Sequence, residues 1–419
     1  MTLDPIDSQT IANDFDHTQP SHSANWTETY AKLRGQCPHG WSNNHGGFWV
    51  ATRYQDVMSV AQSSAFSSAK EYDPENGVLK GGNIIPPFPV QPVLPTEAGN
   101  EERRGYRSFL NRRFTSAEAE KRREVAKQVA RSLIDRVIEK GEIDFVEDLT
   151  SPLPALVTME MFGFDLGNWI DFSEPVHKYM YLRPDHPEYP AIVRKLGAIT
   201  ERLHAEAEDR RRSPRDDLMS YIANGKIDDR ALTDLEVNQM ALNIVFGGVD
   251  TTTALTSNML RHLGRFPEDR QRLIDDPALR PLAREECIRF YAPVHGVARH
   301  AVADVEINGW KIKEGDSIFL AIASANRDSA VFADADRFVI DRKPNRHIGF
   351  GAGMHHCLGL LMARAMFDAM LDEVLDRLPG YTLDPGREEA YSSIDKVNGW
   401  AHMPATFVPG PVLGGGLAI

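Results

Sequence analysis

The residues with the clearest chemical potential lie in the stretch FGAGMHHCLG, from Phe350 to Gly359. A single cysteine, Cys357, follows two histidines, and glycines stand on both sides of it. A helical pattern begins just after the cysteine, where the helix dipole favours a thiolate. The glycines leave room for backbone N–H groups to point at the sulfur. This combination predicts metal or redox chemistry at one sulfur atom.

Three kinds of site are compatible with Cys357. A tetrahedral zinc site is disfavoured, because His355, His356 and Cys357 are consecutive and cannot easily converge on one ion. A nucleophilic cysteine would need a base, and His355 is too close in sequence to establish one. An axial haem ligand fits more of the residues, since the porphyrin supplies four ligands and a single thiolate is enough. The other two cysteines, Cys37 and Cys287, form no CxxC pair and are predicted to be small buried residues.

A second unusual stretch, GGVDTT at 247–252, interrupts a long helical pattern. The pattern begins at a capping box formed by Thr233 and Glu236 and ends at Pro267. Such a helix would have about 32 residues and a length of about 48 Å, enough to cross a whole domain. It is therefore the element expected to carry any central site.

The composition of GGVDTT argues against a purely structural helix. Two glycines each cost about 1 kcal/mol relative to alanine, and threonine hydroxyls can bond back to helix carbonyls and bend the helix. Close packing of Gly247 and Gly248 against another backbone is one explanation. Because Asp250 and Thr251 stand beside them, we favour a ligand lying against a locally distorted helix.

These features resemble the cytochrome P450 family of haem-thiolate monooxygenases. FGAGMHHCLG resembles the family's cysteine-ligand signature, FGxGxHxCxG, at every fixed position, and GGVDTT resembles its oxygen-activating helix motif. Glu286 and Arg289, in a helix expected over 281–293, resemble its ExxR pair, which in isolation would indicate only a solvated ion pair. ANRDSAVFADADRF at 325–338 resembles the meander before the cysteine loop, where Arg337 would complete a buried charge cluster.

The resemblance covers nearly the whole chain. It implies one domain over 1–419, mainly α with a small β portion, built around the long central helix and the cysteine loop. Residues 1–20 are expected to be a flexible N-terminus. The proline-rich segment 74–96 and the segment 178–190 are expected to be lids over the substrate pocket.

The resemblance also implies a cofactor, haem b (iron protoporphyrin IX), with Cys357 as the axial iron ligand. Asp250 and Thr251 match the acid and the alcohol that deliver protons to iron-bound oxygen. At position 103 an arginine replaces a histidine common in bacterial members, and the cation is kept. The implied cofactor-binding set is Arg103, Arg107, Arg299, His347, His355 and Cys357. The implied substrate pocket is mostly apolar and comprises Gln91, Val93, Ile244, Val245, Gly248, Val294, Val297 and Val397.

Composition limits the partners. The formal net charge of -13 argues against binding to nucleic acid or to an anionic membrane, and the longest apolar runs are too short to cross a bilayer. We expect a cytoplasmic monomer. No flavin-like or nucleotide-binding region is evident, so the electrons are expected from an external ferredoxin and its NAD(P)H-dependent reductase. The candidate docking cations are Arg104, Arg112, Arg113, Arg342, Lys343 and Arg346.

The function implied by the resemblance is insertion of one oxygen atom of O₂ into a C–H bond of a small, mostly apolar organic substrate. Two alternatives are a peroxide-driven hydroxylase of the same fold and a non-catalytic haem sensor or carrier. The pair Asp250–Thr251 argues against both, because neither needs an acid and an alcohol beside the iron.

Overall fold

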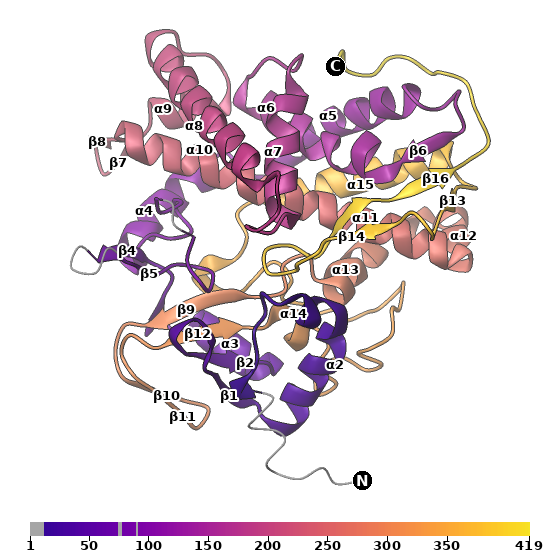
Figure 1. The fold of residues 1–419 in the computed structure, drawn as a ribbon. Coiled ribbons are helices and arrows are strands. Elements are labelled where there is room, and N and C mark those ends of the chain that lie inside the picture. Colours follow the sequence, from indigo (N-terminus) through magenta and orange to yellow (C-terminus); the bar gives the residue numbers. More distant parts are fainter. Residues whose placement is uncertain (1–11, 74–77, 89–90) are drawn as a thin grey trace.

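The computed structural model describes residues 12–73, 78–88 and 91–419. Most of the helices gather at one end of the molecule, and the largest sheet lies at the other, together with α2, α3 and α14 (Figure 1). The helices of four or more residues are α2 (Pro20–Gln36), α3 (Tyr54–Gln62), α4 (Asn100–Asn111), α5 (Ser116–Asp135), α6 (Pro152–Phe162), α7 (Trp169–Tyr181), α8 (Tyr189–Arg212), α9 (Leu218–Ala223), α10 (Asp234–Gly248), α11 (Asp250–Arg265), α12 (Pro267–Asp275), α13 (Arg280–Tyr291), α14 (Ile322–Ala325) and α15 (Leu360–Arg377), with a π-helical turn η2 (Val146–Thr150). The short 3-10 turns are η1 (Asn44–Gly46), η3 (Pro277–Leu279) and η4 (Gly353–His355).

The strands form one sheet of five and several small sheets. The large sheet has the order β1-β2-β12-β9-β3, in which only β2 and β12 run parallel. A three-stranded antiparallel sheet has the order β13-β16-β6. The strands are β1 (His39–Ser42), β2 (Phe48–Ala51), β3 (Phe66–Ser67), β4 (Lys70–Asp73), β5 (Val78–Gly81), β6 (Glu142–Asp144), β7 (Lys226–Ile227), β8 (Arg230–Ala231), β9 (Val297–Ala301), β10 (Val305–Ile307), β11 (Trp310–Ile312), β12 (Ser317–Leu320), β13 (Thr382–Leu383), β14 (Glu389–Ala390), β15 (Trp400–His402) and β16 (Pro404–Thr406). The predicted architecture, mainly α with a small β portion, is confirmed.

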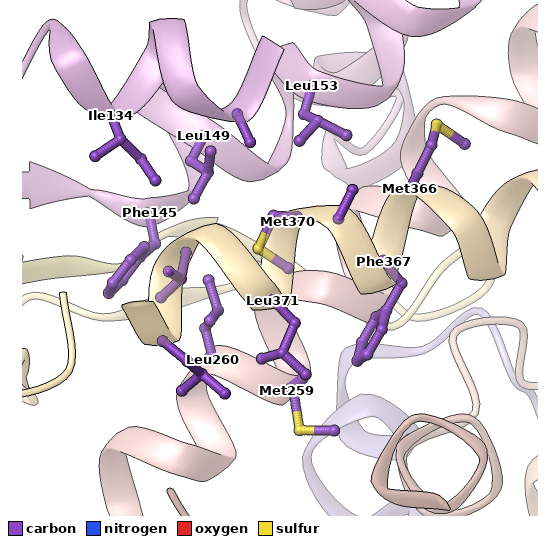
Figure 2. Packing of buried hydrophobic residues seen from close by; sticks show 14 of the residues in the cluster. Ile134, Phe145, Leu149, Leu153, Met259, Leu260, Met366, Phe367, Met370 and Leu371 are labelled. Carbon is purple, nitrogen blue, oxygen red and sulfur yellow. The ribbon is translucent and has the colours of Figure 1, made fainter. Parts of the chain in front are cut away.

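The largest apolar core lies where α15 packs between α5 and α11. Figure 2 shows Ile134 of α5 and Leu153 of α6 on one side of α15 and Met259 of α11 on the other. Met370 and Phe367 of α15 are fully buried between them. Because α15 directly follows the cysteine loop, this packing fixes the position of Cys357 relative to the central helix.

The predicted central helix is present but broken at one residue. The capping box at Thr233 forms as expected, with the Thr233 hydroxyl accepting from the Glu236 N–H and the Glu236 carboxylate accepting from the Thr233 N–H. The helix is distorted at Val249, where ψ is -70°, and α10 and α11 follow one another as two helices. The Val249 N–H still donates to the Val245 carbonyl (3.3 Å), and its carbonyl still accepts from the Thr253 N–H (3.1 Å). The break falls inside GGVDTT, as the glycines and threonines predicted.

The N-terminal expectation is wrong for the residues that the structure describes. Phe15 and His17 are buried against Phe48 and Phe319 of the large sheet. Aromatic burial of this kind outweighs the polar character of the surrounding sequence. Residues 1–11 lie outside the described part of the chain.

The two predicted lid segments meet each other. Glu97, the residue after the first segment, forms a buried ion pair with Lys70 (3.2 Å) and accepts from the N–H of Val93 (3.1 Å), so this end of the segment is anchored. Its Phe88 packs against Tyr179, near the end of α7, with ring centroids 5.8 Å apart. Residues 74–77 and 89–90 of this segment lie outside the described residues.

Candidate functional site

Cys357 lies between η4 and the first turn of α15. Its N–H donates to the carbonyl of Phe350 (2.8 Å) and closes the loop. Gly353 has a φ of 64°, and a Cβ there would lie 2.4 Å from the carbonyl oxygen of Ala61. Only glycine fits such an approach. The loop that carries Cys357 is therefore held against the end of α3 by backbone packing.

The surroundings of Cys357 differ from those of the other two cysteines. Burial raises the pKa of all three thiols. At Cys357, however, the Gly359 N–H and the cations of Arg107 and Arg364 act in the opposite direction. The other two, Cys37 and Cys287, are buried in the core as predicted. A cation bound to the Cys357 sulfur would supply the charge that a buried thiolate needs.

Four of the predicted cofactor-binding side chains converge on one cavity of about 100 Å³. Arg103 and Arg107 reach it from α4, Arg299 from β9, and His355 from the cysteine loop. The remaining lining residues are Asn83, Pro95, Thr96, Val297 and Met354. No carboxylate is among these residues, so the cavity is a concentration of unmatched positive charge.

The pKa values of these groups reflect the excess of positive charge. Burial and then Arg103 lower the pKa of Arg299 to about 9, and burial and then Arg107 lower that of Arg103 to about 10. Burial and then the three arginines lower the pKa of His355 to about 2, so its ring is neutral. Guanidinium groups remain charged in proteins. A ligand with two carboxylates would relieve the repulsion, which is the chemistry of the haem propionates.

The arginines of the cavity are held to different degrees. Arg103 is buried and donates to the carbonyls of Pro95 (3.1 Å) and Ala98 (2.7 Å) and to the Ser68 hydroxyl (2.8 Å). It also donates to Nε2 of His355. Arg299 is also buried, and its one hydrogen bond to a described residue is the donation to the carbonyl of its own neighbour, Ala298 (2.6 Å). Arg103 therefore orders the loop and the His355 ring, whereas Arg299 keeps most of its donors for a ligand.

The expectation for His347 is wrong. Its Nε2 pairs with Glu285 (3.0 Å), and its Nδ1 accepts from the Gly349 N–H (3.2 Å). Glu285 also accepts from Arg364 (2.6 Å). With both ring nitrogens occupied, His347 braces the cysteine loop against α13 and has no donor left for a propionate.

The ExxR pair is fully buried and supports the meander. Arg289 donates twice to Glu286 (2.7 and 2.8 Å) and also to the carbonyls of Asn326 and Ala335 (2.9 and 2.7 Å). Both side chains have 0% exposure. The structural interpretation of this pair therefore fits the geometry, and the solvated alternative does not.

The third member of the cluster is not the predicted one. Arg337 is exposed, and within the described part of the chain it joins the cluster through its carbonyl, which accepts from Arg289 (2.8 Å) and Arg342 (3.3 Å). Arg342 instead places its Nε 3.0 and 3.1 Å from the two carboxylate oxygens of Glu286. The Val339 N–H donates to the same carboxylate (2.7 Å). The turn after the meander directs Arg342 inward, and this direction depends on tertiary packing.

Asp250 lies at the helix break and is fully buried. Its carboxylate is 2.6 Å from Nδ1 of His177 in α7 and accepts from the Tyr391 hydroxyl (3.0 Å). Burial and the adjacent Asp250 raise the pKa of Tyr391, so its hydroxyl is the donor. Nε2 of His177 is buried and has no hydrogen-bond partner among the described residues. Asp250 is thus tied to α7 and to the C-terminal segment, partners that sequence spacing could not identify.

The neighbours of Asp250 define which face of the helix is open. Thr251 donates to the carbonyl of Gly247 (2.7 Å), the back-bonding expected from its position. A Cβ on Gly247 would meet nothing within 4 Å, whereas one on Gly248 would lie 3.6 Å from the Thr158 hydroxyl. Gly247, not the predicted Gly248, therefore presents the accessible surface, and Gly248 packs on α6.

The other predicted pocket residues lie in different surroundings. Val297 lines the cation cavity, and Val93 and Val294 are half-buried. Ile244 and Val245 lie in the apolar cluster against which Leu358, the residue after Cys357, also packs. Val245 is completely buried there, so its assignment to the pocket is wrong.

The other two assignments also differ. Gln91 is exposed, so it is not part of an apolar lining. Val397 is buried in a separate cluster with Tyr179 and Tyr391, beneath the junction of the two lid segments. These differences arise because the predicted lining rested on register in irregular segments.

The candidate docking cations are mostly available. Arg104, Arg112, Lys343 and Arg346 are exposed. Arg113 is half-buried, with its guanidinium over the Tyr221 ring. Arg342 is excluded, since it neutralises Glu286 in the interior.

Within the described part of the chain, every helix is too short or too polar to span a lipid bilayer.

Comparison with known protein families matches residues 156–276 and 283–389 to "Cytochrome P450". The chain is 31% identical over 376 residues to a steroid C26-monooxygenase of Mycobacterium tuberculosis, covering 88% of this chain and 98% of that protein. It is 28% identical over 401 residues to the linalool 8-monooxygenase of Pseudomonas putida, covering 91% and 95%.

Solved structures agree. A mutant of P450 EryK in complex with erythromycin B matches with a TM-score of 0.81 at 27% identity, covering 94% of this chain and 99% of that one. The family carries a haem-thiolate cofactor and acts with molecular oxygen, an organic substrate and redox partners. The single thiol in a glycine-bounded loop and the cavity of unmatched arginines, which His355 of the same loop also lines, are what such a cofactor requires. The chain belongs to the cytochrome P450 family and is a monooxygenase.

Proposed function

We propose that the chain binds haem b as one haem-thiolate domain, with the sulfur of Cys357 as the axial ligand of the iron. Arg107, Arg299 and the neutral His355 would hold the propionates, and Arg103 would orient His355. When bound, the haem supplies the activation of O₂ and the insertion of one oxygen atom into a C–H bond.

One observation carries this proposal. Three buried or half-buried arginines surround a cavity without a carboxylate, and His355, which also lines it, is two residues from Cys357. Buried cations are normally paired. A group that brings both an anion for the arginines and a metal for the thiol satisfies all of these side chains together.

The proposed reaction is hydroxylation of a small, mostly apolar organic molecule. The relatives named for a steroid and for linalool support an apolar substrate. The accessible face of Gly247 lies next to Phe246, which packs against Tyr179 with ring centroids 5.8 Å apart. Phe246 and Tyr179 would thus form an aromatic roof above the helix break. This roof would exclude water from the reacting carbon.

Asp250 and Thr251 would move the protons. The Thr251 hydroxyl stands at the open face of the break, and its lone pairs are free to accept a hydrogen bond while it donates to Gly247. It would pass a proton on by releasing its own hydrogen from the Gly247 carbonyl. Asp250 is buried beside it and can regain a proton through His177 or Tyr391. This pair supports an O₂-dependent reaction over a peroxide-driven hydroxylase or a haem sensor.

The electrons would come from a ferredoxin and an NAD(P)H-dependent reductase. Ferredoxins of this kind are acidic, and the exposed cations Arg104, Arg112, Lys343 and Arg346 would form the contact surface. The chain would act as a cytoplasmic monomer, which can bind and release the ferredoxin.

The absorbance of the reduced, carbon-monoxide-bound protein tests the haem assignment. The wild-type protein is expected to show the long-wavelength band of thiolate-ligated haem. Cys357→His is expected to lose that band, and Cys287→Ala, a buried cysteine outside the site, to keep it. A band typical of histidine-ligated haem in intact wild-type protein would refute the assignment.

The coupling of electrons to product tests the role of Thr251. Thr251→Ala is expected to keep the substrate-induced shift of the haem absorbance but to form less product per NAD(P)H and more hydrogen peroxide. Thr256→Ala, a change in a buried threonine one turn further on, is the control for helix damage. Full coupling in Thr251→Ala would remove this residue from the proton path.

A further inference from the structure

The roof of the proposed pocket, where the two lid segments meet, contains a lysine that forms no ion pair with the described residues. Lys396 lies in the connection between β14 and β15, one residue before the buried Val397. Its ammonium donates to the carbonyl of Tyr179 (2.8 Å), at the end of α7. It lies 4.5 Å from the ring centroid of Tyr179 and 5.7 Å from that of Phe88. Lys396 is therefore placed where the two lid segments and the C-terminal segment meet.

This environment leaves the ammonium incompletely satisfied. An ammonium has three donors, and one hydrogen bond is formed with the described residues. Two carboxylates lie near enough to raise its pKa, those of Asp395 and Asp250, but neither forms an ion pair with it. Burial has the larger effect and lowers that pKa. Lys396 is half-buried, so its charge is only partly withdrawn from water. Partial withdrawal without an anion is still unfavourable, and the two aromatic faces offset only part of that cost.

The position of Lys396 relates it to the substrate and not to the haem. Phe88, Tyr179 and Lys396 belong to the aromatic cluster that also holds Phe246 of α10 and Ala254 of α11, on both sides of the helix break. The cavity that suits the propionates contains none of these residues. An anion bound to Lys396 would thus lie in the roof, with an apolar body extending along the central helix.

We propose that Lys396 binds a carboxylate of the substrate, so that the preferred substrate is an apolar molecule ending in a carboxylic acid. This proposal rests on the proposed function and defines the substrate class. The two free donors of the ammonium suit one carboxylate, and the rings of Phe88 and Tyr179 would flank the adjoining carbon chain. A phosphate group would require further cations, and among the described residues Lys396 is the one cation that lies over the rings of Phe88 and Tyr179.

Matched pairs of ligands test the proposal. The probes are dodecanoic, geranic and cholanic acids, which have a linear, a terpenoid and a steroid skeleton, and the primary amide of each. Binding to the haem-loaded protein at neutral pH is measured by the shift of the haem absorbance and, independently, by equilibrium dialysis. For at least one skeleton the acid is expected to bind about ten- to a hundredfold more tightly than its amide, as for one charged hydrogen bond.

Three variants assign that preference to Lys396. Lys396→Met keeps the length of the side chain and is expected to reduce the acid-to-amide ratio to about one, with amide affinities unchanged within about twofold. Lys396→Arg is expected to keep the preference. Lys313→Met, which removes an exposed lysine paired with Asp304, is the control and should behave as the wild type.

Other outcomes contradict the proposal. Equal binding of acids and amides by the wild type, or no binding of any of the three acids, would exclude a carboxylate site. An equal loss of affinity for acids and amides in Lys396→Met would show that the lysine only stabilises the packing of the roof. The carbon-monoxide spectrum is recorded on every sample, so a failure of the haem assignment is recognised separately, and dialysis still reports on Lys396.

Discussion

Two arginine-rich clusters lie in the interior of this protein, and they differ in whether their charges are matched. In the first, Glu286 accepts from Arg289, Arg342 and a backbone N–H, and the remaining arginine donors meet carbonyl oxygens. In the second, three arginines and a neutral histidine line a cavity that has no carboxylate. The first cluster is complete without a ligand, whereas the second is not.

The difference separates structure from function. A buried ion network that satisfies itself fixes the geometry of the chain, in this case the meander that leads to the cysteine loop. A buried cluster of like charges costs free energy in the folded protein, and it is retained where a ligand supplies the opposite charge. The same residue type, arginine, therefore indicates a brace in one region and a binding site in the other.

Removing the shared acid should break the matched cluster. Glu286→Ala leaves Arg289 and Arg342 buried without a carboxylate, which is expected to lower the free energy of unfolding by about 3–5 kcal/mol. Thermal melting and the haem content of purified protein measure the loss. Glu314→Ala, an exposed acid, is the control. A normal melting temperature for Glu286→Ala would mean that the network carries little stability.

The corrected third member of this cluster can be tested against the predicted one. Arg342→Met removes the bifurcated hydrogen bond that the Arg342 Nε–H donates to Glu286 and is expected to cost about 1.5–3 kcal/mol of unfolding free energy. Arg337→Met keeps the backbone carbonyl and is expected to change it by less than about 0.5 kcal/mol. Chemical denaturation of both variants decides the assignment, and the reverse order of effects would favour Arg337.

Removing a cation from the unmatched cluster should not destabilise the haem-free protein but should weaken the binding of haem. Arg299→Gln removes a buried cation, so the stability of the haem-free protein is expected to stay unchanged or to rise. The haem affinity is expected to fall about tenfold, which corresponds to about 1.4 kcal/mol. Denaturation of the haem-free protein and haem transfer to an acceptor protein measure the two quantities. Parallel losses in both would make Arg299 a structural residue, and Arg194→Gln, an exposed site, is the control.

Removing the haem should produce the smallest and most local effect. Hydrogen exchange is expected to accelerate in residues 95–107 and 353–358, where the cations lose their counter-charge, and to stay nearly constant in 284–289 and 335–345. Exchange that changes equally in both regions would mean that the two clusters form one cooperative unit.

The sequence predicted the parts of the fold that depend on local chemistry. The capping box at Thr233, the distortion within GGVDTT, the glycine-rich turn at Gly353 and the helix after Cys357 were all readable, because caps, glycines and helix periodicity act over a few residues. The convergence of Arg103, Arg107, Arg299 and His355 was expected from the family resemblance, and the structure brings them together. The pocket lining was predicted less well, since it depends on the register of irregular segments.

By itself, the sequence determined which residue types could hold a cofactor: one thiol in a tight loop, a broken helix with an acid and an alcohol, and several arginines. Tertiary structure alone decided which of those residues are matched. Arg342 and not Arg337 reaches Glu286, His347 is taken by Glu285, and Asp250 is bound by His177 and Tyr391. Lys396 is left without an acid for the same reason. The partners of a buried charge come from distant segments of the chain, and their distances are set only when those segments pack.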